Sequence, residues 1–147
     1  MRGRECSLAN ALAVVGERWS LLALREVMLG SRRFDQIARN TGASRDILAT
    51  RLRTLVDAGV LARQQYESQP PRYEYVPTEA GLALQPVLLS LMQWGDKYVT
   101  TGPPPTAFSH ECGADLHVQT VCTECGEQLQ PGTVQVLRLG GLPVQTT

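Results

Sequence analysis

The chain has 147 residues, of which 43% are hydrophobic and 19% are charged. These proportions suit one folded domain of ordinary size with room for a small appendage. Fourteen Lys and Arg residues balance fourteen Asp and Glu residues, so net charge alone gives no argument for a nucleic-acid partner. No apolar run approaches the roughly 20 residues that span a bilayer. The N-terminus also lacks the apolar stretch of a signal peptide, so we expect a cytoplasmic protein with no membrane partner.

The distribution of charge is more informative than its sum. Residues 1–100 hold thirteen basic and ten acidic side chains, a net of +3, whereas residues 101–147 hold one and four, a net of −3. Between residues 32 and 72 there are eight basic side chains against four acidic ones. All basic residues except Lys97 are arginines, whose planar guanidinium suits bidentate contacts with phosphate and guanine. High-GC codon usage is an alternative explanation of this arginine bias.

Two helices are predicted at the start of the chain. The first runs from Ser7, a suitable N-cap, to Val15, and it ends before Gly16. The second covers residues 19–29 and is almost wholly apolar apart from Arg25 and Glu26. We therefore expect this second helix to form the buried centre of the domain.

The next two predicted helices form a helix-turn-helix. A short helix over residues 34–39 is followed by a turn at Thr41 and Gly42, and a longer helix covers residues 44–58. At 100° per residue, the leucines of this longer helix share one narrow stripe, and polar residues lie opposite them. The buried stripe is Leu48, Leu52 and Leu55. Gly59 is placed to end the helix in the left-handed conformation.

A β-hairpin is predicted directly after this helix. Residues 60–66 and 72–76 have the composition of strands, and Pro70 and Pro71 lie in the turn between them. Such a hairpin is the wing of a winged helix. A last helix is predicted from Thr78 to about Val99, with a break near Pro86, because proline disrupts a helix interior.

The remaining chain is expected to form a separate small domain. Three consecutive prolines make residues 101–105 a stiff linker after the domain of residues 1–100. Residues 106–147 show little helical periodicity, and alternation over 116–121 and 133–137 predicts small strands before a loose tail from residue 140. The predicted fold is thus mainly α with some β (α+β): a winged helix-turn-helix followed by a small β domain resembling a zinc ribbon.

A helix in the DNA major groove needs side chains that reach base edges and others that hold phosphates. The residues opposite the leucine stripe, together with basic residues at the helix-turn-helix entrance and in the wing, are the candidates. The candidate DNA-binding residues are Arg32, Arg33, Ser44, Arg45, Asp46, Ala49, Thr50, Arg51, Arg53, Arg63 and Arg72. Ser44 also marks a helix N-terminus, where free N–H groups favour a phosphate. For each side chain taken alone, solvated surface is the alternative.

Several motifs in order resemble the HxlR-type winged-helix transcriptional regulators. They are Cys6-Ser-Leu-Ala-Asn-Ala-Leu-Ala-Val-Val-Gly-Glu-Arg-Trp19, Leu29-Gly-Ser-Arg-Arg-Phe-Asp-Gln-Ile37, Leu48-Ala-Thr-Arg-Leu-Arg-Thr-Leu55 and Pro71-Arg-Tyr-Glu-Tyr-Val-Pro-Thr-Glu-Ala-Gly81. The resemblance covers roughly residues 5–98. It implies a bacterial regulator that binds double-stranded DNA, a homodimer paired through its first and last helices, and a roughly two-fold operator. The apolar residues suited to that seam are Leu8, Leu12, Leu88, Leu91, Met92 and Trp94, and an intramolecular core is the alternative.

Cys6 matches the N-terminal cysteine of that family, which in some members senses oxidants or electrophiles. A sensor thiol should be exposed, with a lowered pKa, and nearby arginines and a helix N-terminus would favour the thiolate. The alternative, which we favour, is a small packing residue with no redox role. A small-molecule or redox effector is thus compatible with the sequence but not specified by it.

The C-terminal region carries a candidate metal site. Cys122-Thr-Glu-Cys125-Gly has the spacing of a zinc knuckle, and His110 with Cys112 would complete three sulfurs and one nitrogen, with His117 as a substitute for His110. The first half is His-x-Cys rather than Cys-x-x-Cys, which weakens the pattern. The alternatives are a ribbon that has lost its metal and a disulfide formed on handling, since the cytosol keeps thiols reduced.

Three classes of function remain open at this point. A sequence-specific transcriptional regulator is favoured, and a winged-helix protein-interaction module with little DNA affinity is the alternative. The chain shows no nucleophile–base–acid set, no P-loop and no Rossmann glycine pattern, so we do not expect an enzyme. A redox enzyme using Cys122 and Cys125 is the one catalytic form that the residues suggest.

Overall fold

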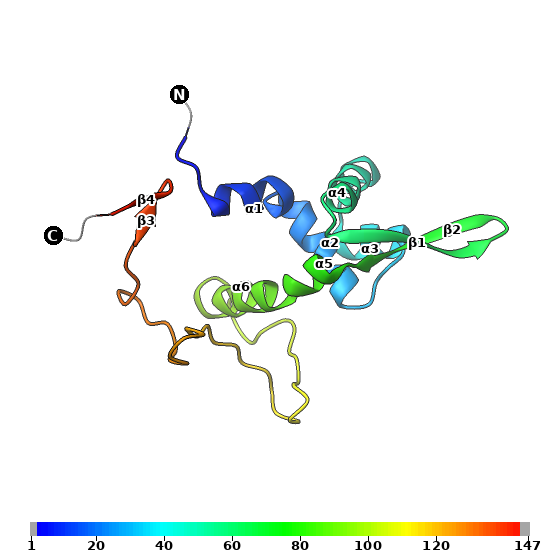
Figure 1. Ribbon diagram of the computed structural model, residues 1–147. Helices are drawn as coiled ribbons and strands as arrows, with labels where there is room; N and C mark the ends of the chain where they lie inside the picture. The colour runs from blue at the N-terminus through cyan, green and yellow to red at the C-terminus, as the bar shows by residue number, and fades with distance from the viewer. Residues whose placement is uncertain (1–2, 145–147) are drawn as a thin grey trace. The chain divides into compact units, whose positions relative to one another are not determined.

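Figure 1 shows the computed structural model, which describes residues 3–144. The chain divides into two compact units. One is Ser7–Leu88, and the other comprises the residues from Leu89 onward together with the short segment before Ser7. Within residues 3–144, no helix is long and apolar enough to cross a membrane.

Four helices open the Ser7–Leu88 unit, as the sequence predicts. They are α1 (Ser7–Val15), α2 (Arg18–Met28), α3 (Phe34–Thr41) and α4 (Arg45–Asp57). The predicted ends agree to within two residues. Leu24 of α2, Ile37 of α3 and the three leucines of α4 are fully buried in one core, which also contains Leu88. The apolar stripes of these helices therefore meet, and this burial is the main favourable term for the helix-turn-helix.

The turn between α3 and α4 is built from side-chain hydrogen bonds and one glycine. Gly42 has φ +76°, a left-handed conformation that glycine adopts without strain. Before it, the Thr41 hydroxyl donates to the Ile37 carbonyl at 2.7 Å. After it, the Ser44 hydroxyl accepts a hydrogen bond from the Ile47 N–H at 3.3 Å, which confirms the predicted N-cap. These bonds fix the angle at which α4 leaves α3.

Glu26 is a buried carboxylate that joins α2 to α3. Its Oε1 lies 2.8 Å from Arg25 Nη2, and its Oε2 accepts a hydrogen bond from Asn40 Nδ2 at 2.9 Å. Asn40 also donates to the Ser31 hydroxyl at 3.2 Å. A buried charge is tolerated when it is paired and hydrogen-bonded in this way. Glu26 thus holds α3 at a defined position beside α2.

The wing is an antiparallel hairpin of β1 (Leu61–Ser68) and β2 (Pro71–Pro77). It is longer than predicted, because Pro71 pairs with Ser68 as the first residue of its strand, where a missing N–H is tolerated. Hydrogen bonds join its base to the segment before α3 and to the end of α4. The Tyr75 N–H donates to the Arg32 carbonyl at 2.7 Å, and the Val60 N–H donates to the Leu55 carbonyl at 2.9 Å. These bonds define the position of the wing beside the helix-turn-helix.

The predicted last helix is two helices, α5 (Glu79–Ala83) and α6 (Gln85–Tyr98), with the break at Leu84. Pro86 explains the break, because its ring clashes with the carbonyl four residues earlier and it has no N–H to donate. Thr78 caps α5 as predicted: its hydroxyl accepts from the Gly81 N–H at 3.2 Å. The same hydroxyl contacts the Gly59 and Val60 carbonyls, which joins the end of α4 to the start of α5.

The C-terminal part contains less β structure than predicted. Strands over 116–121 and 133–137 do not form; isolated bridges join Ser109 to Asp115 and Val121 to Gln128. The strands that do form are β3 (Arg138–Leu139) and β4 (Leu142–Pro143), the latter inside the predicted tail, of which residues 145–147 lie outside the described range. Over 133–137 the apolar residues lack a surface to cover, since Val134 and Leu137 are 70% and 73% exposed.

Candidate DNA-binding surface

The outer face of α4 is a polar, exposed row opposite the buried leucines. The predicted residues Ser44, Arg45, Asp46, Thr50 and Arg53 are all exposed, and Ala49 is half-buried between them and the core. The Thr50 hydroxyl donates to the Asp46 carbonyl at 3.0 Å. Within residues 3–144, the Arg53 guanidinium makes no ion pair or side-chain hydrogen bond. Sequence periodicity thus places this face correctly, and Arg53 is its most available cation.

Arg45 lies at the N-terminus of α4 and contacts α3. Its Nη1 is 2.7 Å from Asp35 Oδ1, and its guanidinium lies 4.8 Å from the centre of the Phe34 ring. The side chains of Arg45 and Asp35 are 70% and 72% exposed. Such an exposed pair contributes at most about 1 kcal/mol and is screened by salt. A phosphate could therefore replace Asp35 as the partner of Arg45 at little cost.

The basic residues around the wing lie on tyrosine rings. Arg63 lies 3.9 Å from the centre of the Tyr73 ring, and Arg33, at the start of α3, lies 4.5 Å from the centre of the Tyr66 ring. Stacking holds a guanidinium flat and leaves the N–H groups at its edge able to donate. These tyrosines are not among the predicted residues. The available signal was their place in the two strands that also carry Arg63 and Arg72.

Three other predicted residues have different surroundings. Arg72 is half exposed, and its Nε lies 3.1 Å from Glu67 Oε2 across the tip of the wing. The side chain of Arg32 is exposed beside the base of the hairpin. Arg51 faces inward instead: its Nη2 lies 3.8 Å from Glu17 Oε2, and its Nε is buried. The structure therefore separates Arg51 from the exposed row of α4.

The cysteines occupy exposed or half-exposed positions. Cys6 is exposed at the start of α1. In the Cys122–Cys125 turn, the backbone N–H of Cys125 hydrogen-bonds the Cys122 sulfur. This bond lowers the pKa of the Cys122 thiol, with smaller contributions from the Glu124 N–H and the Cys125 thiol. The turn is closed by the Gly126 N–H, which donates to the Cys122 carbonyl at 2.7 Å.

The four predicted metal ligands do not meet. In the part of the chain that the structure describes, no three His, Cys, Asp or Glu side chains are close enough to hold one metal ion. Cys122 and Cys125 form a pair, but His110 and Cys112 do not join it, and a structural zinc site needs four ligands. The residues thus do not fit the zinc site that their spacing suggests.

Freshly purified protein should therefore contain little zinc. Because two thiolates without further ligands bind zinc weakly, we expect less than about a tenth of an equivalent per chain. Elemental analysis before and after chelation measures this. Stoichiometric zinc, released by the chelator with loss of structure in residues 106–147, would contradict the expectation and restore the four-ligand prediction.

Three features define a winged-helix DNA-binding protein: a helix-turn-helix packed on an apolar core, a β-hairpin hydrogen-bonded to it, and an exposed helix face that carries arginines. The family model described as HxlR-like helix-turn-helix matches residues 14–103. The chain belongs to this family of DNA-binding transcriptional regulators, which confirms the predicted resemblance and the predicted α+β winged-helix fold of residues 1–100, but not the resemblance of the C-terminal region to a zinc ribbon.

Relatives and solved structures agree with this assignment. The chain is 48% identical over 125 residues to the HTH-type transcriptional regulator Rv3095 of Mycobacterium tuberculosis, covering 84% of this chain and 79% of that one. The crystal structure of PA1607, a proposed transcription factor, is similar with a TM-score of 0.62 and 33% identity over 96% of this chain and 89% of that one. The oxidized form of the redox regulator HypR is similar with a TM-score of 0.59 and 28% identity, covering 65% and 100%. The match to PA1607 extends beyond residue 103, so the C-terminal region has a counterpart there.

Proposed function

We propose that the chain acts as a homodimer on a roughly two-fold operator, with α4 in the major groove and the wing on the backbone or in the minor groove. The observation that carries this proposal is the outer face of α4. Arg45, Thr50 and Arg53 are exposed there, while the opposite face is locked into the core by three fully buried leucines. A helix held in this way can enter a groove without rearranging the domain.

The residues of this surface divide into two groups by their chemistry. Arg53 and Thr50 lie along the body of α4, where side chains reach base edges, and arginine is well suited to guanine. Ser44 and Arg45 lie at the helix N-terminus, where free N–H groups and a cation favour phosphate. Arg33 and Arg63, whose guanidinium groups lie over tyrosine rings, are assigned to the DNA backbone beside the wing. We thus assign base contacts to the body of α4, and phosphate contacts to its N-terminus and to the arginines beside the wing.

Exposed apolar side chains support the dimer. On α1, Leu8 and Leu12 are 65% and 50% exposed, and on α6, Leu91 and Trp94 are 51% and 57% exposed. Apolar side chains gathered on one helix face usually mark a protein interface. A two-fold dimer would bury the same side chains of α1 and of α6 in both copies and bring two recognition helices to successive turns of DNA.

Selection of bound DNA from a random pool tests the proposal. We expect a roughly two-fold site bound by two protomers, as measured by sedimentation of the complex. A dimer that neutralises six to ten phosphates should lose about 10³–10⁵ in affinity between roughly 50 and 200 mM salt. Binding that is unselective, or no stronger than background at moderate salt, would instead support a protein-interaction module. The proposal assigns the chain no catalytic step.

A redox input at Cys6 is compatible with this function. Cys6 is exposed at the N-terminal end of the chain, as a reactive thiol must be. One similar structure, that of HypR, is of a redox regulator in its oxidized form. These two observations favour the sensor alternative over the packing alternative for this residue.

A further inference from the structure

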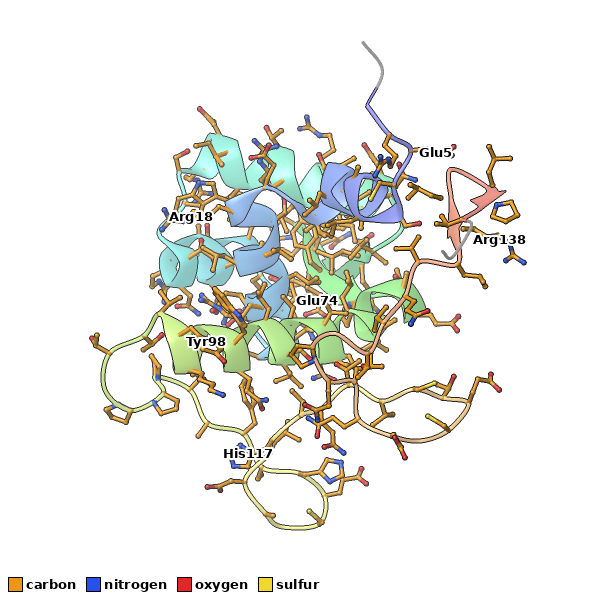
Figure 2. The ribbon with its side chains drawn as sticks, turned by 90° about the vertical axis from the view of Figure 1, so that its left-hand side faces the viewer. Glu5, Arg18, Glu74, Tyr98, His117 and Arg138 are labelled. Carbon is orange, nitrogen blue, oxygen red and sulfur yellow. The ribbon has the colours of Figure 1, made fainter. Side chains whose placement is uncertain are left out.

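A cavity of about 570 Å³ lies between α6 and the segment 103–118 that follows it. Its volume is in the range of small-molecule sites. The walls are mainly apolar: Leu89 and Met92 come from α6, and Phe108, Leu116 and Val118 come from the returning segment. Figure 2 labels Tyr98 at the end of α6 and His117 on the segment that returns alongside the helix.

Hydrogen bonds to the backbone of the returning segment fix the walls of this cavity. The Gln93 carboxamide both donates to the Val118 carbonyl and accepts from the Val118 N–H, each at 2.9 Å. The Leu116 N–H donates to the Phe108 carbonyl at 2.8 Å, and the bridge between Ser109 and Asp115 continues this pairing. The returning segment is therefore held along α6 by directional bonds, although it forms no regular strand. Such a cavity is preformed, which reduces the entropy lost when a ligand binds.

The charges at the cavity favour a cation. Asp96, half-buried on α6, and Asp115 both line it. Neither carboxylate forms an ion pair or accepts a side-chain hydrogen bond from any residue in the range 3–144. Lys97 also lines the cavity, but its ammonium lies 5.2 Å from the centre of the Tyr98 ring. The lining thus holds two carboxylate side chains and one lysine side chain.

We propose that this cavity binds a small lipophilic monocation, an organic molecule with an aromatic or alkyl body and one amine or onium charge. The apolar walls cover the body. Asp96 is half-buried, so its attraction for the charge is stronger than it would be in water, and the exposed Asp115 adds a second negative charge at the cavity. The binding site goes beyond the DNA-binding role and does not depend on it.

The test compares two ions of the same shape and opposite charge, tetraphenylphosphonium and tetraphenylborate, by equilibrium dialysis against the full chain. At an ionic strength of about 0.15 M, long-range attraction is screened, so a difference reports local contacts. We expect one tetraphenylphosphonium per chain, bound at least about tenfold more tightly than tetraphenylborate. Equal affinity for the two ions would overturn the proposal.

Matched variants locate the site. The double variant Asp96→Asn/Asp115→Asn should lower tetraphenylphosphonium affinity by about tenfold and remove the preference for the cation. The control Glu111→Gln/Glu124→Gln removes the same net charge from exposed residues outside the cavity and should bind as the parent chain does. An equal loss in both double variants would overturn the proposal, because net charge would then explain it. Unchanged circular dichroism and DNA binding in all variants separate loss of ligand from loss of folding or of the proposed function.

Discussion

Replacing Arg45 and Arg53 together by glutamate should abolish specific DNA binding. Each substitution turns an attraction for the phosphate backbone or a guanine edge into a repulsion, and the two sites lie at different turns of α4. We expect a loss of at least about 100-fold at moderate salt, with a smaller salt dependence in what binding remains. Fluorescence anisotropy with the selected operator measures both quantities. Unchanged affinity would mean that α4 is not the recognition helix.

The control for this variant carries the same change in charge elsewhere. Arg18 lies at the start of α2 beside Trp19, and Arg138 lies in β3. The variant Arg18→Glu/Arg138→Glu should retain most of the affinity, since only the general attraction between protein and DNA is weakened. Stability should change little in either variant, because the Arg45 ion pair is exposed and Arg53 has no partner among the described residues. If both double variants lost affinity equally, the loss would reflect the net charge of the protein and not contacts between α4 and DNA.

The face of α4 could be predicted from the sequence because helical geometry alone determines it. Once Leu48, Leu52 and Leu55 share a stripe, Thr50 and Arg53 must point the other way. Gly59 was likewise predictable, and its φ of +76° confirms the left-handed end of the helix. In the same way Ser44 and Thr78 cap their helices as their side-chain chemistry requires. Local periodicity and local chemistry thus give the helices and the recognition surface.

Contacts between distant segments could not be predicted in this way. Arg51 lies only two residues from Arg53, yet it faces Glu17, which directly precedes α2, and no periodicity gives the position of Glu17. Glu26 interrupts the apolar sequence of α2. Only the structure shows that a hydrogen bond from Asn40, fourteen residues away, makes the burial of its carboxylate favourable. The strand predicted over 133–137 does not form for a related reason: alternation predicts a strand only where a neighbouring surface covers one face.

Gly81 shows how a residue that weakens a sequence prediction can be required by the fold. Glycine lowers helix propensity, so Gly81 is by itself an unfavourable residue near the start of the helix predicted from Thr78. In the structure Gly81 is buried where α5 passes the end of α4, and a Cβ atom there would collide with the Val60 carbonyl oxygen. The contacted atom is backbone, and the same carbonyl accepts from the Thr78 N–H at 3.1 Å and from its hydroxyl at 3.0 Å. It therefore cannot move aside without breaking the bonds that join α5 to α4.

The variant Gly81→Ala should consequently be strongly destabilised. Overpacking against backbone typically costs about 1–3 kcal/mol, which for a unit of this size lowers Tm by roughly 10 °C. Thermal unfolding followed by circular dichroism measures the shift.

The control is Gly95→Ala in α6, where nothing lies within 4 Å of an added Cβ atom. The same methyl group there should leave the free energy of unfolding unchanged or raise it by up to about 1 kcal/mol, because alanine loses less backbone entropy than glycine in a helix. Since the two substitutions are chemically identical, their difference reports the close approach of Gly81 to Val60 and not helix propensity. Equal Tm values for the two variants would mean that α5 can move away from Val60, and that the end of α4 and the base of the wing are not held by this contact.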